Sequence, residues 1–224
     1  MNTQVVVITH AEGRAAFFRH QKFWEAFQSP ILILTPDESD LSGYDYERLS
    51  VGKAQHNGPD SIIRLQALFE TLEKRNWDRC IIYEYDSFSL TPKQPCGPGL
   101  FGIVFKNHES PKFMAPRYVN PPWSFDRKTF DLMHSKSTQF HNLFEDGEAD
   151  RWISALAFLA GVPIFNYDPP GFSRGTITSV DIPDVSHAVR EAKAIHFHGV
   201  KQEWVLRAVE QFYDEANPHN KISI

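Results

Sequence analysis

The 224-residue chain is long enough to bury a substantial core, and its 42% of hydrophobic residues, with 18 Phe and 5 Trp, indicate a globular rather than a disordered protein. With 23 Lys and Arg against 28 Asp and Glu, the net charge is -5, and no block of basic residues stands out. Nucleic acid is therefore not expected as a partner, because the positive surface that dominates such binding is missing. The two cysteines form neither a disulfide framework nor a zinc-site spacing.

The amino-terminal residues, MNTQVVVITHAEG, lead straight into an apolar strand, without the basic start and longer apolar run of a signal peptide. The least polar stretch, ISALAFLAGVPIF, is shorter than the roughly 20 residues that cross a bilayer. We therefore expect a cytoplasmic protein without a transmembrane segment. Peripheral contact with a membrane and the oligomeric state both stay open.

Strands and helices alternate in the first half of the chain. The apolar runs QVVVIT (4–9) and ILILT (31–35) are typical of strands covered on both faces. A helix is expected within 11–27, and a second one begins near Pro59, whose fixed φ suits a first turn. The segment RCIIYEYD (79–86) then forms a third strand. This order predicts a parallel sheet of βαβ type.

The second half is less regular. Strands are expected at 100–105, near 112–119, at 162–167 and at 193–198, and helices at 126–136, at 148–161 with Gly161 as its end, and in the segment KQEWVLRAVEQFYDEA. No repeat, low-complexity tract or linker divides the chain. The sequence therefore predicts a single α/β domain with a Rossmann-like, mostly parallel central sheet flanked by helices.

Glu84 and Asp86 stand one residue apart at the end of the third strand. Alternation along a strand puts both carboxylates on one face and Tyr85 on the other. In an open parallel sheet, ligands bind beyond the carboxyl ends of the strands. Two neighbouring carboxylates repel each other unless they are hydrated, hydrogen-bonded or bridged by a cation, and hard ions such as Mg²⁺ or Mn²⁺ prefer oxygen ligands. The alternative interpretation is a solvated strand end.

The segment AIHFHGVK (194–201) places His196 and His198 on one face of a short strand, followed by Lys201. An imidazole can complete a metal shell that a carboxylate begins, and an ammonium can neutralise charge on a diphosphate. A His-x-His pair by itself is also consistent with a hydrogen-bonded polar strand. Together with the acidic strand end, the pair predicts a site for a metal ion and a diphosphate.

The order of these motifs resembles that of the GT-A fold glycosyltransferases, which use nucleotide-diphosphate sugars. YEYD stands in the place of their Asp-x-Asp motif, and FEDGEAD and HFHGVK follow in order. The resemblance implies one GT-A-like domain over 1–224, in which 1–90 is the nucleotide-sugar-binding half and 91–224 holds the acceptor-side half and the C-terminal helix. It also implies a divalent cation, Mn²⁺ or Mg²⁺, as cofactor.

The resemblance implies a role for individual residues. Asp86 would bind the metal ion, and Glu84 would approach the ribose or the sugar. HFHGVK is similar to the His-Phe-x-Gly-x-x-Lys-Pro-Trp pattern of the glycogenin-like branch, so His196 or His198 would be a further metal ligand. Lys201 stands one residue early for the phosphate-binding lysine, and QE replaces Lys-Pro. Donor contacts are also implied for Thr9, His10, Asp37, Lys53, Asn57 and Arg64, although Asp37 also suits a turn and Asn57 a helix start.

The segment FEDGEAD carries four carboxylates just before the helix expected near Ala149. A helix amino end favours negative charge, so capping by Asp146 or Glu148 explains part of this segment. The resemblance implies that it also includes the general base of inverting members, with Asp146 as first choice and Glu145 as second. Trp123, in the segment that resembles the acceptor side, either stacks on a sugar ring or packs in the core.

The sequence thus predicts a hexosyltransferase-type glycosyltransferase that moves a sugar from a nucleotide-diphosphate donor to a hydroxyl of a glycan or another acceptor. One alternative is a non-catalytic nucleotide- or sugar-binding relative of the same fold. A sugar nucleotidyltransferase is less favoured, because THAEGRAAF lacks the glycine-rich basic loop that holds a triphosphate. The donor, the acceptor and the choice between inversion and retention stay open.

Overall fold

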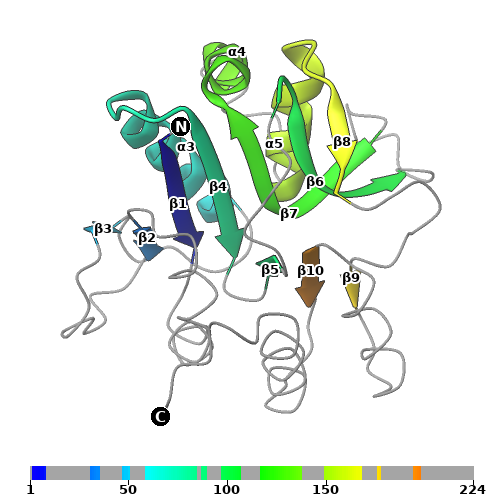
Figure 1. The fold of residues 1–224 in the computed structure, drawn as a ribbon, viewed down its shortest axis with the longest axis horizontal. Coiled ribbons are helices and arrows are strands. Elements are labelled where there is room, and N and C mark those ends of the chain that lie inside the picture. Colours follow the sequence, from blue (N-terminus) through cyan, green and yellow to red (C-terminus); the bar gives the residue numbers. More distant parts are fainter. Residues whose placement is uncertain are drawn as a thin grey trace.

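The computed structural model describes residues 2–8, 31–35, 47–50, 59–84, 87–89, 97–106, 117–137, 149–167, 176–177 and 194–197. The described strands form two sheets (Figure 1). In spatial order, the larger sheet contains β3 (Glu47–Ser50), β2 (Ile31–Thr35), β1 (Thr3–Ile8), β4 (Arg79–Glu84), β7 (Arg117–Asp126), β6 (Leu100–Lys106) and β8 (Ile164–Asn166). The smaller sheet contains β5 (Ser87–Ser89), β10 (Ala194–Phe197) and β9 (Thr176–Ile177).

The larger sheet is mixed rather than parallel throughout. β3, β2, β1 and β4 run in one direction, β7 lies antiparallel between β4 and β6, and β8 is parallel to β6. The prediction of an α/β fold with an open sheet flanked by helices is confirmed. β6 and β7 are consecutive strands among the described residues, and they pair antiparallel.

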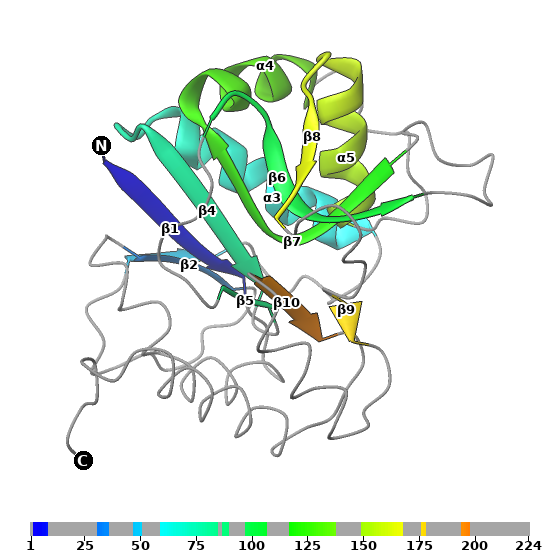
Figure 2. The same cartoon turned by 45° about the vertical axis from the view of Figure 1, so that its right-hand side comes forward.

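Three helices, α3 (Pro59–Glu73), α4 (Arg127–Ser137) and α5 (Ala149–Leu159), lie on one face of the larger sheet (Figure 2). The core forms between them and the sheet. The Phe69 ring of α3 lies at its centre, 5.1 Å from the Phe130 ring and 5.4 Å from the Trp152 ring. On the opposite face Val5, Val7 and Ile81 are also fully buried. β1 and β4 are therefore covered on both faces, as their continuous apolar runs predict.

The ends of most predicted helices and strands lie within one to four residues of the observed ends, but three features differ. β10 matches the strand expected at 193–198, but β3, β5 and β9 were not predicted, because they are only two to four residues long. β7 continues through Pro121 and Pro122, well past the predicted end at 119. There the register of its partner β6 shifts between Phe101 and Ile103, so the ladder accommodates two residues without N–H groups. The helices expected at 11–27 and after Lys201 lie outside the described residues.

Gly161 ends α5 as the sequence predicts. Its φ is 66°, its N–H donates to the carbonyl of Phe158, and the Val162 N–H donates to the carbonyl of Ala157. This pair of hydrogen bonds satisfies the last carbonyls of the helix. The chain then turns directly into β8, the strand at the outer edge of the sheet.

Gly102 allows β6 and β7 to approach closely. A Cβ atom at this position would lie 2.2 Å from Val119 Cγ2 and 2.8 Å from the backbone carbonyl oxygen of Asn120. Gly102→Ala is therefore expected to lower the free energy of unfolding by about 1–3 kcal/mol, measured by urea denaturation. Gly97→Ala is the control, because a Cβ atom at Gly97 would meet nothing within 4 Å. Equal stability of the two variants would contradict the close packing.

Candidate functional site

The chain changes direction across the sheet between β1 and β4. From β1 it continues to β2 and then β3 on one side, and it returns to β4 on the other side of β1. Ile8 and Glu84, the last residues of β1 and β4, are partners in the parallel ladder. Open α/β sheets bind ligands at such a switch point, beyond the carboxyl ends of the strands. The topology therefore places the candidate site beside Glu84.

Glu84 is the last residue of β4 and is partly exposed. Cys80 and Ile82, which precede it at alternate positions, are fully buried in the core beneath α3, whereas Tyr83 is buried on the other face. The strand therefore ends with a partly exposed carboxylate directly after its buried residues. Tyr85 and Asp86 lie outside the described residues.

Ser87, the first residue of β5, returns the chain to Glu84. Its hydroxyl accepts a hydrogen bond from the Glu84 N–H at 2.8 Å and donates one to the Glu84 carbonyl oxygen at 3.1 Å. The side chain is fully buried. A single hydroxyl therefore holds the end of β4 and the start of β5 together.

The small sheet brings the histidine segment to the acidic segment. β10 pairs antiparallel with β5, and His196 is the ladder partner of Ser87. On its other side β10 pairs in parallel with β9, where His196 is the partner of Thr176. Both views of the fold place β5 and β10 beyond the carboxyl end of β4 (Figures 1 and 2). The backbones of the two segments that the sequence singles out are therefore neighbours.

Arg64 is the other predicted donor contact within the described residues. It lies in the first half of α3, and its side chain is 4% exposed. Because β3 and β4 are parallel, α3 carries the chain back from the carboxyl-end edge of the sheet, so Arg64 is nearer that edge than the helix end is. The remaining predicted site residues, Thr9, His10, Asp37, Lys53, Asn57, Asp86, Glu145, Asp146, His198 and Lys201, lie outside the described residues.

Trp123 is a packing residue. It is fully buried, and its indole N–H donates to the Val119 carbonyl oxygen at 2.8 Å. Of the two interpretations of this tryptophan, stacking on a sugar ring is therefore wrong, because no face of the ring reaches the surface. The prolines beside it form part of the β7 strand rather than a loop wall.

Cys80 does not supply a nucleophile at this site. Burial raises the pKa of the Cys80 thiol far above its usual range, and the neighbouring positive charge of Arg79 offsets only part of that increase. Because the thiolate is the reactive form, this thiol is inert in the folded protein.

Ser87 is the residue that sequence reasoning missed. The available signal was a hydroxyl residue three positions after Glu84, a spacing at which a serine side chain can bond back to the backbone.

Within the described ranges, no three His, Cys, Asp or Glu residues gather closely enough to hold a metal ion. The same ranges contain no helix with the length and apolar character to cross a membrane.

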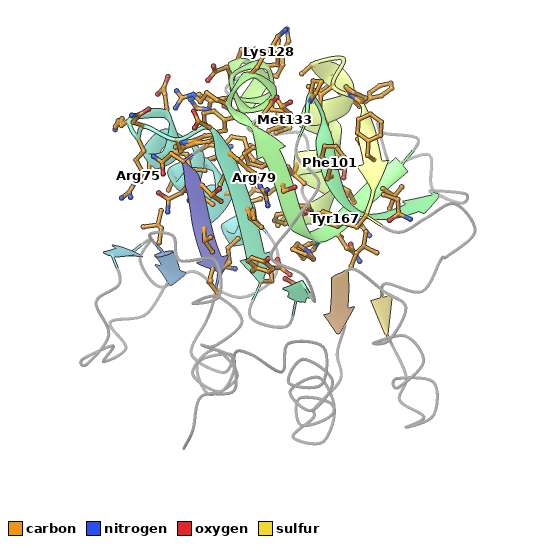
Figure 3. The ribbon with its side chains drawn as sticks, viewed as in Figure 1. Arg75, Arg79, Phe101, Lys128, Met133 and Tyr167 are labelled. Carbon is orange, nitrogen blue, oxygen red and sulfur yellow. The ribbon has the colours of Figure 1, made fainter. Side chains whose placement is uncertain are left out.

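Figure 3 shows side chains of α4 at one end of the sheet. Lys128 and Met133 of α4 lie at the end opposite to β5 and β10. Phe130 and Met133 of α4 pack in the core, whereas the carboxyl end of β4 carries the Glu84 carboxylate and the Ser87–His196 ladder.

Comparison of the chain with protein-family models finds no match, and comparison with curated proteins finds none either.

Proposed function

We propose that the chain is a metal-dependent glycosyltransferase that moves a sugar from a nucleotide-diphosphate donor to an acceptor hydroxyl. The observation that carries the proposal is the position of Glu84 at the switch point, with His196 beside Ser87 in the adjoining ladder. In this arrangement a segment with carboxylates and a segment with imidazoles are neighbours at the place where an open sheet binds its ligand, which supports the proposal. A single acidic strand end without the histidine segment would support only a solvated edge.

The donor groups suit a hard divalent cation. Carboxylate oxygens, with imidazole as a further ligand, are compatible with Mg²⁺ or Mn²⁺. In this proposal Asp86 and one of the histidines, His196 or His198, hold the ion, and Glu84 supports the ribose or the sugar. When bound, the ion would stabilise the negative charge that develops on the departing diphosphate.

The remaining proposed roles concern the donor and the acceptor. The nucleotide and the sugar are contacted by Thr9, His10, Asp37, Lys53, Asn57 and Arg64. Lys201 contacts the phosphates. Asp146, with Glu145 as the alternative, accepts the proton of the acceptor hydroxyl if the sugar configuration inverts. Of these proposed contacts, Arg64 belongs to the described residues and lies in the first half of α3.

A thermal-shift screen of the purified chain tests the proposal. UDP, GDP, ADP and CDP are each added with and without Mn²⁺ or Mg²⁺. One diphosphate is expected to raise Tm by about 5–10 °C at roughly a hundredfold excess over its Kd, because ligand that binds the folded state stabilises it by about 2.7 kcal/mol. The increase is expected to require the metal ion.

Donor hydrolysis then separates the enzyme from a non-catalytic relative. The enzyme hydrolyses the sugar conjugate of the selected nucleotide slowly when the metal ion is present. A binding relative shows the thermal shift without hydrolysis or transfer. No shift with any nucleotide would contradict both.

A further inference from the structure

Ser87 joins the two sheets of the molecule. Through its side chain it holds both the N–H and the carbonyl of Glu84, the last residue of the larger sheet's β4. Through its backbone it is the ladder partner of His196 in the small sheet. Its side chain is fully buried, so water does not compete for these hydrogen bonds. One residue therefore fixes the spacing between the end of β4 and β10.

We propose that Ser87 is a positioning residue of the metal site, a conclusion that rests on the proposed function. Asp86 is the residue bonded directly before Ser87, and His196 is the residue paired with it. By fixing Ser87 against Glu84, the hydroxyl keeps the backbone of the acidic segment in register with the backbone of the histidine segment. A metal ion would then bind beside a strand end and a ladder whose main-chain positions are set before it arrives.

The consequence for metal affinity follows from preorganisation. Without the hydroxyl, the Glu84 N–H and carbonyl lose this partner, and the end of β4 is held less firmly against the start of β5. Binding must then order these two strand ends, which weakens affinity without removing any metal ligand. Loss of groups that orient ligands typically lowers metal affinity by about 10- to 100-fold. We expect a change of this size for Ser87→Ala.

Ser154 provides a matched control. It is also a fully buried serine, its hydroxyl accepts a hydrogen bond from the Val119 N–H at 3.0 Å, and it donates to the Asp150 carbonyl. It joins α5 to β7 instead of joining the two sheets. Ser154→Ala therefore removes the same chemistry from the core and should lower stability to a similar extent, while metal affinity stays unchanged.

The experiment measures Mn²⁺ affinity by electron paramagnetic resonance of the free ion, with the protein alone and with UDP or GDP added. Wild type, Ser87→Ala, Ser87→Thr and Ser154→Ala are compared, and urea denaturation gives the stability of each. The proposal expects weaker binding by about 10- to 100-fold only in Ser87→Ala, with the Thr hydroxyl restoring affinity. Ser87→Cys, whose thiol forms weaker hydrogen bonds, replaces Ser87→Ala if that variant does not fold.

Two different results would overturn the proposal. If wild type binds Mn²⁺ and Ser87→Ala binds it equally well, with a stability loss like that of Ser154→Ala, the serine is structural only and the proposed function stands. If wild type binds no Mn²⁺ in any arm, the metal-dependent function fails and the role of Ser87 fails with it. The wild-type measurement therefore distinguishes the two failures.

Discussion

Replacing Asp86 with Ala is expected to lower metal-dependent sugar transfer by about 10²- to 10³-fold. The proposed ion stabilises developing charge by several kcal/mol, and every 1.36 kcal/mol changes the rate tenfold. Glu84→Ala is expected to cause a smaller loss, because Glu84 is proposed to support the donor rather than to ligate the ion. Initial rates with the donor identified by thermal shift, over a range of Mn²⁺ concentrations, provide the measurement.

Asp78→Asn is the control for this prediction. Asp78 directly precedes β4 at its other end, where its carboxylate accepts a hydrogen bond from the Asn2 backbone N–H at 2.6 Å. The variant therefore alters a carboxylate at the far end of the same strand and should leave the rate and its Mn²⁺ dependence unchanged. Undiminished metal-dependent activity in Asp86→Ala would remove Asp86 from the mechanism. In that case a solvated strand end would be the better interpretation of YEYD.

The position of Glu84 was predictable from the sequence, because β4 is a continuous apolar run and its polar end marks the edge of the core. The strand of β10 was also predicted, at 193–198, but its pairing with β5 was not. Its ladder with β5 joins strands of four and three residues that are far apart in the chain, and such short strands carry no periodicity. Their pairing is decided by tertiary contacts with β4 and β7 rather than by local preference.

At the two prolines of β7, the local sequence pattern predicted a strand that ends too early. Proline removes a ladder donor, so a central strand through Pro121 and Pro122 is disfavoured on local grounds. The structure accommodates both where the register with β6 shifts and where Gly102 lets the backbones approach. The buried neighbours Val119, Trp123 and Phe125 stabilise the strand on either side of the irregularity. Packing therefore overrides the local preference there.

Arg127→Ala is expected to lower the free energy of unfolding by about 2–4 kcal/mol. The Arg127 guanidinium donates to the carbonyl oxygens of Arg75 at 2.9 Å and Glu73 at 3.1 Å, and it also approaches that of Leu72 at 3.4 Å. Leu72 and Glu73 are the last residues of α3, and Arg75 lies two residues beyond it, so the guanidinium binds carbonyl oxygens at the carboxyl end of the helix. Hydrogen bonds from charged groups contribute about 1.5–3 kcal/mol each, and the partial exposure of Arg127 lowers the sum.

The aromatic surroundings of Arg127 add to this loss. The guanidinium carbon lies 5.2 Å from the centre of the Trp77 ring and 5.4 Å from that of Phe130, within the range of cation–π attraction. Arg127→Lys keeps the charge but loses the planar fork, so it should be intermediate. Asp131→Asn removes only the exposed ion pair, whose N–O distance is 2.9 Å, and should cost less than about 1 kcal/mol.

The same variants separate the stability of the fold from the proposed site. Arg127 begins α4, at the end of the sheet opposite to Ser87 and the β10 ladder (Figure 1). Arg127→Ala should therefore lower the urea midpoint while the Mn²⁺ affinity of the folded protein stays at the wild-type value. Ser87→Ala should weaken Mn²⁺ binding in addition to any loss of stability. If Arg127→Ala also weakened Mn²⁺ binding, affinity would follow overall stability, and the local role of the Ser87 hydroxyl would lose its support.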